Sequence, residues 1–186
     1  VGIMLVISTF NLQRSDLVGV PPYTSHCVLE AVSRVATLSS GFVALKTKIR
    51  LLYHQWGYVQ EQNVKEVVIE DAADSLCSLG AQLFPAGGNF EIWSLPKLLG
   101  CSCGGVIWCR NLEDAEKIRY ERDKHSTGAL LQWLLRLVGQ FSQRIHLYWA
   151  GFEAGVGKLP GIAAGEILSA LGRWQKIILD RESKLE

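Results

Sequence analysis

Two short segments of the chain hold residues that could act together on one ligand. The first, "VVIEDAADSL" (67–76), is an apolar run that leads into two carboxylates, Glu70 and Asp71. The second, "SLPKLLGCSCGG" (94–105), places a single lysine, Lys97, beside a glycine-rich turn. In α/β sheets, ligands bind beyond the carboxyl ends of the strands. A carboxylate at the end of the first segment would therefore face the same crevice as an amine at the end of the next strand.

This pair of side chains suits one kind of cofactor. A lysine can react with a carbonyl group to form a Schiff base, and a cofactor aldehyde supplies that carbonyl. A pyridine cofactor also needs an anion beside its ring nitrogen, because the protonated ring is an electron sink. Asp71 and Lys97 are thus the minimal pair for pyridoxal phosphate (PLP). Each residue alone has a simpler explanation, since such a lysine is usually only solvated and an aspartate after a strand usually forms a turn or a helix cap.

Strands and helices alternate along the chain. Helical segments carry apolar residues on one face, and strand segments are short apolar runs bounded by turn residues. The alternation predicts an α/β fold with a mostly parallel sheet flanked by helices. The segment 2–10, "GIMLVISTF", fits a strand or a helix, since its β-branched residues favour a strand. We expect strands over 17–22, 49–54, 64–71, 90–95 and 104–110, and helices over 24–36, 111–123, 129–139 and 164–183.

Composition limits the class of protein. The chain has 186 residues, of which 48% are hydrophobic and 20% are charged, and this suits one domain with a sizeable core. A net charge of +1 with scattered basic residues gives no electrostatic attraction to nucleic acid, so we expect no nucleic-acid binding. No apolar run is long enough to span a membrane, because the best candidate, 129–139, is short and contains Arg136.

The cysteine and histidine residues form no recognisable metal motif. Five cysteines are an odd number, and with no secretory signal before them they favour a reduced, cytoplasmic protein. "CSC" (101–103) with Cys109 matches no standard zinc spacing, and buried thiols are the simpler explanation. His54, His125 and His146 lie far apart in sequence. We therefore expect no metal site.

The order and spacing of several motifs resemble a known family. "VIEDAADSL" (68–76), followed by "FEIWSLPKLLGCSCGGVIWCRNLEDAEKIRYERD" (90–123), is similar to the core of the DegT/StrS sugar aminotransferases, which are PLP enzymes of fold type I. In that family a strand ending in E-D-A-A is followed by a lysine motif and then by a glycine pair. Weaker similarity extends over 11–32, 51–58 and 167–181, so that nearly the whole chain is covered. The matching motifs here are Glu70-Asp71-Ala72-Ala73, Leu95-Pro96-Lys97 and Gly104-Gly105.

The resemblance implies where this chain lies within such an enzyme. Residues 1–125 would be part of the large, PLP-binding domain, and residues 126–186 a helical connection and the start of the C-terminal small domain. The segment 2–10 would be a helix. The phosphate-binding turn would precede the chain and most of the small domain would follow it, so the chain would be about half of a family member, truncated at both ends. The connection 36–48 is also shorter than the family's, which usually carries an extra strand and a loop.

The same resemblance implies a role for each site residue. Lys97 would form the Schiff base with PLP and, once freed, move a proton between substrate and cofactor carbons. Asp71 would hold the protonated ring nitrogen. Asp74 stands where the family has a glutamine near the phenolic oxygen of PLP, where its charge would be repelled unless it is turned away or protonated. Ser25 replaces the aromatic residue that stacks on the ring, and the neighbouring His26 would stack instead or merely face solvent.

Two classes of function remain open. The resemblance implies a transferase, namely an aminotransferase that moves an amino group from an amino-acid donor to a keto-sugar nucleotide, as in polysaccharide biosynthesis. Retention of Lys97 favours transamination, because the dehydratases of the family have histidine there. The family also implies a homodimer in the cytoplasm. The alternative is a non-catalytic remnant of the family that acts only as a structural or interaction protein.

Overall fold

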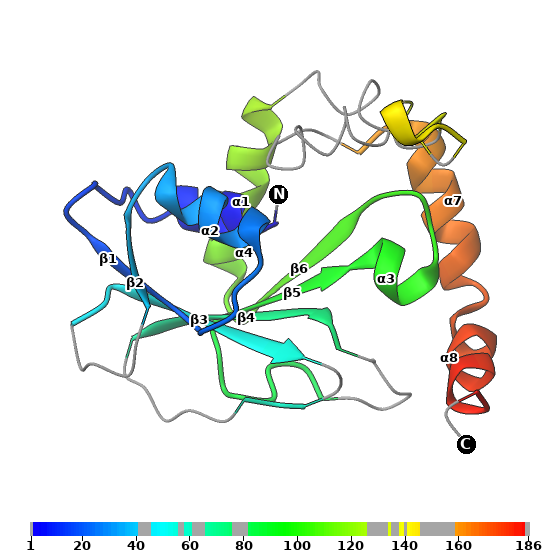
Figure 1. Cartoon of the computed structure of the whole chain (residues 1–186), viewed down its shortest axis with the longest axis horizontal. Helices are drawn as coiled ribbons and strands as arrows, with labels where there is room; N and C mark the ends of the chain where they lie inside the picture. Colours follow the sequence, from blue (N-terminus) through cyan, green and yellow to red (C-terminus); the bar gives the residue numbers. More distant parts are fainter. Residues whose placement is uncertain are drawn as a thin grey trace.

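The computed structural model describes residues 2–40, 46–55, 58–60, 66–75, 82–125, 134, 138–139, 141–145 and 159–184. Its described strands form one six-stranded sheet in the order β2-β1-β3-β4-β5-β6 (Figure 1). Neighbouring strands are parallel, except that β6 pairs with β5 in the antiparallel direction. The strands are β1 (Leu17–Val20), β2 (Thr37–Ser40), β3 (Ile49–Gln55), β4 (Val67–Asp74), β5 (Phe90–Ser94) and β6 (Gly105–Cys109). The helices are α1 (Gly2–Ser8), α2 (His26–Ser33), α3 (Leu95–Leu99), α4 (Leu112–Lys124), α7 (Gly161–Leu171) and α8 (Trp174–Glu182).

The predicted fold class is confirmed, since the sheet is mostly parallel and flanked by helices. Helices α1, α2 and α4 lie on one face of the sheet (Figure 1). The segment 2–10 forms helix α1, as the family resemblance implies and against its β-branched composition. Its burial explains this outcome, because Ile3, Val6 and Ile7 all enter the core from a helix and tertiary packing overrides weak intrinsic preference.

One strand of the sheet was not predicted from the sequence. The connection 36–48 does carry a strand, β2, which pairs in parallel with β1 at the edge of the sheet. Two hydrogen bonds fix its first residue: the Thr37 amide donates to the Asp16 carbonyl at 2.9 Å, and the Thr37 hydroxyl donates to the Arg14 carbonyl. The sequence of β2, "TLSS", is polar because this strand buries little of its surface. An edge strand of this kind lacks the apolar run by which the other strands were predicted.

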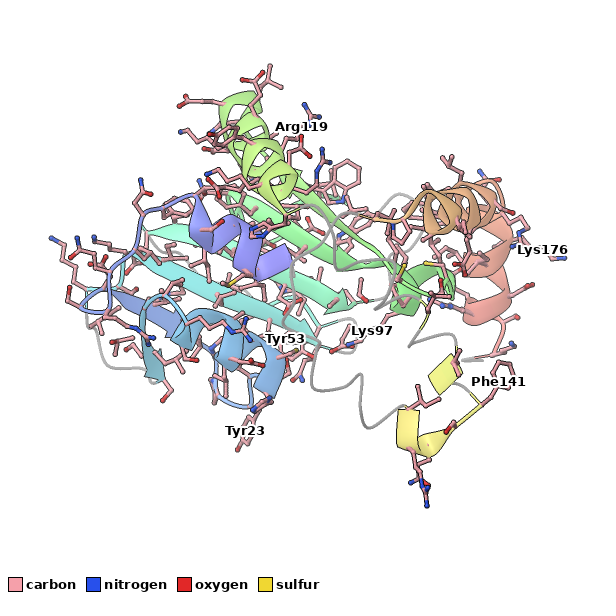
Figure 2. The ribbon with its side chains drawn as sticks, turned by 90° about the horizontal axis from the view of Figure 1, so that it is seen from above. Tyr23, Tyr53, Lys97, Arg119, Phe141 and Lys176 are labelled. Carbon is pink, nitrogen blue, oxygen red and sulfur yellow. The ribbon has the colours of Figure 1, made fainter. Side chains whose placement is uncertain are left out.

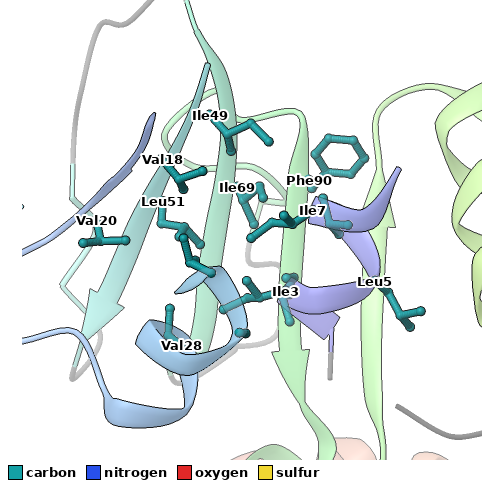
Figure 3. Close-up of a cluster of buried hydrophobic side chains, with 14 of the residues drawn as sticks. Ile3, Leu5, Ile7, Val18, Val20, Val28, Ile49, Leu51, Ile69 and Phe90 are labelled. Carbon is teal, nitrogen blue, oxygen red and sulfur yellow. The ribbon is translucent and has the colours of Figure 1, made fainter. Parts of the chain in front are cut away.

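The main core lies between the sheet and the helices α1 and α2. Alternate side chains of the central strands point toward these helices, as the period of a strand requires. Ile7 of α1 and Ile69 of β4 are fully buried, and Phe90 of β5 is 1% exposed. Figure 3 shows helix α1 packed across the strands that carry Ile69 and Phe90. The Phe90 ring also meets Phe10 edge to face, with 5.8 Å between ring centroids. This packing fixes the central strands, β4 and β5, whose ends carry the site residues.

A second apolar cluster covers the other face near the carboxyl ends of the strands. Trp93 of β5 is its centre, with ring centroids 5.3 Å from Trp108 and 5.8 Å from Trp174. Helices α3, α7 and α8 supply its other main members: Leu95, Leu98, Leu99, Ile167, Ala170 and Ile178. The cluster therefore ties the C-terminal helices to the helix that carries Lys97.

The C-terminal helical region differs in detail from the prediction. The single helix expected over 164–183 is two helices, α7 and α8, separated at Gly172 and Arg173. The helix expected over 129–139 falls largely outside the described residues. Among the helices that are described, none is long and apolar enough to cross a membrane.

Candidate functional site

Strand β4 brings two adjacent carboxylates to opposite faces of the sheet. It is an interior strand, with Asp71 paired to Tyr53 of β3 and to Ile92 of β5. Because successive side chains of a strand point to opposite faces, Glu70 and Asp71 enter different environments. Only one of them can belong to a given site.

Glu70 is held in a closed network inside the protein. Its side chain is fully buried and accepts hydrogen bonds from the amides of Gly88 at 2.5 Å and Ala86 at 3.1 Å. The Nδ1 atom of His54 accepts from the Gln60 amide at 3.1 Å, so Nε2 carries the proton and donates to Glu70 at 2.7 Å. Burial raises the pKa of Glu70, but the hydrogen bonds from His54, Ala86 and Gly88 outweigh it and leave the pKa below its usual value. Glu70 therefore holds the loop before β5 in place and is not free to bind a ligand.

Asp71 has a free oxygen. Its side chain is 7% exposed, and Oδ1 accepts a hydrogen bond from the Ala73 amide at 3.1 Å. Oδ2 has no hydrogen-bond partner among the described residues. Burial raises the pKa of Asp71 above its usual value, and the Ala73 amide and the charge of Lys97 only partly oppose this. A buried carboxylate with an unused oxygen is suited to bind a cationic N–H group.

Asp71 is one of the residues that line a small pocket. The pocket is enclosed by the segment that leads into α2 and by the last residues of β3, and its members are Pro21, Thr24, Ser25, Val28, Leu51, Leu52, Tyr53 and Asp71. Its enclosed space is about 10 Å³, near the room of one water molecule, so only the end of a larger ligand could enter it. Ser25 lines this pocket. His26, in the first turn of α2, is exposed and does not line it, so its stacking role stays a prediction.

Lys97 lies in the short helix α3 directly after β5. Pro96 occupies the first turn of this helix, and Gly100 ends it in a left-handed conformation with φ of 70°. The Lys97 ammonium donates to Oδ1 of Asp74, the last residue of β4, and its side chain is 56% exposed. Oδ2 of the same carboxylate accepts a hydrogen bond from the hydroxyl of Tyr53. Tyr53 and Lys97 thus meet at one carboxylate beyond the strand ends (Figure 2).

A bulge in β4 places Asp74 at this position. The register between β3 and β4 shifts at this point. Tyr53 pairs with Asp71 and Gln55 pairs with Asp74, so β4 has one residue more than β3 between the two pairs. Residues three apart in a regular strand would point to opposite faces, and one extra residue returns the side chain to the first face. The bulge therefore directs Asp74 toward Tyr53 and Lys97, on the side of the sheet to which Asp71 points.

Helix α7 supports the turn that follows Lys97. The Glu166 carboxylate accepts hydrogen bonds from the Ser102 amide at 2.7 Å and from the Ser102 hydroxyl. Gly104, with φ of 112°, lies so close to α7 that an added Cβ atom would be 2.8 Å from Ile167 Cδ1. Sequence reasoning missed Glu166 and Tyr53, because no local motif marks a partner 64 or 21 residues away.

The described residues fit the chemistry of PLP. Asp71 is a buried residue within β4, and its unused oxygen can serve as a partner for the pyridine nitrogen. Lys97 offers a primary amine at the same edge of the sheet. Within the described part of the chain, no group of three metal-ligating side chains occurs. The structure thus brings together Asp71, Asp74 and Lys97, and leaves His26 on the outer surface.

The comparisons with known proteins agree with this chemistry. The model of a family described as "Putative PLP-dependent aminotransferase" matches residues 1–185, and the chain belongs to this family. No curated protein matches the sequence.

Solved structures share the fold at low sequence identity. A protein of Streptococcus pneumoniae described as a "putative sugar aminotransferase" is 18% identical, with a TM-score of 0.53 over 65% of this chain and 43% of that one. A DegT DnrJ EryC1 StrS aminotransferase of Brucella abortus is 20% identical, with a TM-score of 0.50 over 63% of this chain and 41% of that one. The ureidoglycine-glyoxylate aminotransferase of Bacillus subtilis is 16% identical, with a TM-score of 0.51 over 97% of this chain and 52% of that one. The fold is that of fold type I aminotransferases, and the chain spans 41% to 52% of the length of these three proteins.

Proposed function

We propose that this chain carries the PLP-binding part of an aminotransferase, with Asp71 and Lys97 as its central residues. One observation supports this most strongly. Asp71 is buried within β4 and keeps an unused oxygen, while Lys97 presents its amine just after the neighbouring strand β5. In this proposal residues 1–125 belong to the large domain, and residues 126–186 form the connection to the small domain and its start.

Each residue has a distinct task. Bound PLP supplies an electron-withdrawing ring that stabilises negative charge on the substrate carbon. Asp71 keeps the ring nitrogen protonated, because an adjacent carboxylate favours the charged pyridinium. Lys97 would hold the cofactor through its amine and, when that amine is free, would carry the substrate proton. Asp74 and His26 are proposed as further cofactor contacts, at the phenolic oxygen and at the ring face respectively.

The substrate class is a finer proposal. We infer an amino-acid donor and a keto-sugar nucleotide acceptor from the DegT/StrS-like motifs around Asp71 and Lys97. The descriptions of the Streptococcus and Brucella proteins are consistent with this class. We further propose that the protein acts as a homodimer in the cytoplasm, a compartment that suits the reduced thiols of Cys27, Cys101 and Cys109.

A spectral titration tests the central proposal. PLP is added to the purified chain, the absorbance of the lysine adduct is recorded, and the adduct is reduced with borohydride and located by peptide mass spectrometry. We expect the adduct on Lys97 in the wild-type chain and its loss in Lys97→Ala. The matched control is Lys176→Ala, which alters an exposed lysine of α8 and should keep the adduct. An adduct that survives Lys97→Ala would overturn the assignment of the lysine.

The second stage measures amino transfer. Conversion of bound PLP to its amine form is followed with a panel of amino acids, and then the return reaction with keto-sugar nucleotides. Asp71→Asn should keep the Lys97 adduct but slow both half-reactions, because a neutral amide no longer stabilises the pyridinium. A chain that forms no adduct and transfers no amino group would favour the non-catalytic alternative.

A further inference from the structure

The carboxylate of Asp74 joins three separate elements at one point. Its Oδ1 binds the Lys97 ammonium from α3, and its Oδ2 accepts the Tyr53 hydroxyl from β3. Both oxygens are therefore used, and the side chain of Asp74 is only 28% exposed. The partners lie 21 and 23 residues away in sequence, so the cluster depends on the assembled sheet.

Most other lysine pairs of the described chain are of a simpler kind. Lys117 binds Glu113 and Lys124 binds Glu121 within one turn of α4, where both partners lie on the same exposed helix. Such local pairs contribute little and rearrange easily. Asp74 differs from these carboxylates because a second donor from another element holds it in place. Its ion pair with Lys97 is thus fixed by the fold.

The ion pair with Asp74 should make Lys97 less reactive toward an aldehyde. Formation of an imine needs the lone pair of a neutral amine, and an ammonium bound to a carboxylate has none to offer. The Lys97 ammonium must first leave Asp74 and release a proton to water. The nitrogen then bonds to the aldehyde carbon, the C=O bond breaks, and the oxygen leaves as water.

We propose that Asp74, held by Tyr53, restrains Lys97 and must release it before the amine reacts with an aldehyde. Asp74 is in this sense a positioning residue that acts through Lys97, and the proposal rests on the proposed function of Lys97. The restraint keeps the amine at the strand ends, close to the pocket of Asp71, and lowers its reactivity until a ligand competes for the carboxylate.

Reaction with a small aldehyde tests the restraint without the cofactor. The folded chain is treated with limiting formaldehyde and cyanoborohydride, which supplies the hydride, and the methylation rate of each lysine is measured by peptide mass spectrometry. Lys176 is the internal reference, because it is exposed on α8 and has no ion pair among the described residues. We expect Asp74→Asn to raise the Lys97 rate about two- to fivefold, the range that an exposed ion pair of this kind supports. Tyr53→Phe should raise it less, because the charge of Asp74 remains.

A matched control separates this effect from general loosening. Lys48 pairs at 2.8 Å with Asp16, whose other oxygen accepts from the Gln13 amide at 2.8 Å. Asp16→Asn should raise the methylation rate of Lys48 and leave that of Lys97 unchanged. Asp74→Asn should do the reverse. Thermal unfolding shows whether each variant is folded.

Salt gives a second measurement on the unmodified chain. Exposed ion pairs are screened by salt, with a Debye length near 10 Å at 0.1 M and about 3 Å at 1 M. The Lys97 rate relative to Lys176 should therefore rise with salt in the wild-type chain and stay flat in Asp74→Asn. The wild-type measurement does not depend on whether the variant folds.

The outcomes distinguish this inference from the proposed function. An unchanged or slower Lys97 rate in folded Asp74→Asn, or a wild-type rate without salt dependence, would overturn the restraint while the PLP adduct on Lys97 still stands. A PLP adduct that survives Lys97→Ala would overturn the proposed role of Lys97, and the restraint on a catalytic amine would fall with it.

Discussion

Asp71, within β4, and Lys97, in the helix that follows the neighbouring strand β5, do not pair with each other. Lys97 binds Asp74, and Asp71 accepts only from the Ala73 amide among the described residues. The charge of Lys97 is near enough to lower the pKa of Asp71, although burial dominates and raises it. The two groups are thus close but separately held, which leaves an oxygen of Asp71 available to a ligand.

Replacement of Lys97 should separate chemistry from stability. Lys97→Ala removes an exposed ion pair, so the free energy of unfolding should fall by no more than about 1 kcal/mol. The PLP adduct should disappear completely, because Lys97 is the lysine that lies directly after β5, in α3. Chemical denaturation and absorbance of the same samples measure both effects. If Lys97→Ala loses both its fold and the adduct, the peptide mass spectrum of the wild-type chain decides whether Lys97 is the lysine that carries the adduct.

Asp71→Asn should stabilise the protein at neutral pH. Burial holds the pKa of Asp71 above its usual value of 3.8, so the folded state binds its proton more tightly than the unfolded state does. The ionised form therefore costs stability, and this cost appears as the pH rises through the raised pKa and persists above it. Asp71→Asn should have a higher Tm than wild type at pH 7, and the difference should shrink toward pH 3. An equal or lower Tm at pH 7 would contradict this account.

Glu70→Gln should show the opposite pH dependence. Hydrogen bonds from His54 and two amides hold the pKa of Glu70 below its usual value of 4.5 despite its burial. The ionised form therefore stabilises the folded state above pH 4.5, and this contribution is lost as the pH falls through the lowered pKa. Glu70→Gln turns an amide group toward at least one donor and should cost about 3 kcal/mol at pH 7. Unfolding curves should show this loss in the free energy of unfolding at pH 7 and a smaller loss at pH 3.

Gly88→Ala should disrupt the same network by its size alone. A Cβ atom at this position would lie 2.6 Å from Glu70 Oε1 and 2.7 Å from Glu70 Cγ, both of which are fixed in the interior. We expect a loss of about 2 kcal/mol or more in the free energy of unfolding. Gly165→Ala is the matched control, because nothing lies within 4 Å of its Cβ position in α7. That control should be neutral or stabilising by up to about 1 kcal/mol.

Glu166→Ala should loosen the turn that follows Lys97. The variant leaves the Ser102 amide and hydroxyl without their carboxylate, and hydrogen bonds to a charged group contribute about 1.5–3 kcal/mol. Hydrogen exchange of the amides in 101–105 should accelerate by about tenfold or more. Glu121→Ala, which removes an exposed pair within α4, should leave these amides unchanged. Equal exchange in both variants would show that α7 does not hold the turn.

The apolar periodicity of the sequence determined most of the elements. Strands β3, β4 and β5 and helices α2 and α4 were predictable, because each buries a continuous run or one face and so records its environment in its own residues. Strand β2 was missed for the same reason, since a polar edge strand buries too little to leave such a record. Helix α1 needed the family resemblance, because its composition favours a strand.

The sequence by itself also determined that acidic residues and a lysine accompany two successive apolar runs, since this needs only the order of residues along the chain. Only the tertiary structure decided which carboxylate Lys97 meets. That choice depends on the bulge between Asp71 and Asp74, which turns Asp74 toward Tyr53, and a one-residue change of register leaves no mark in composition. The support from Glu166 likewise exists only once α7 packs on the turn, because its partner is 64 residues away.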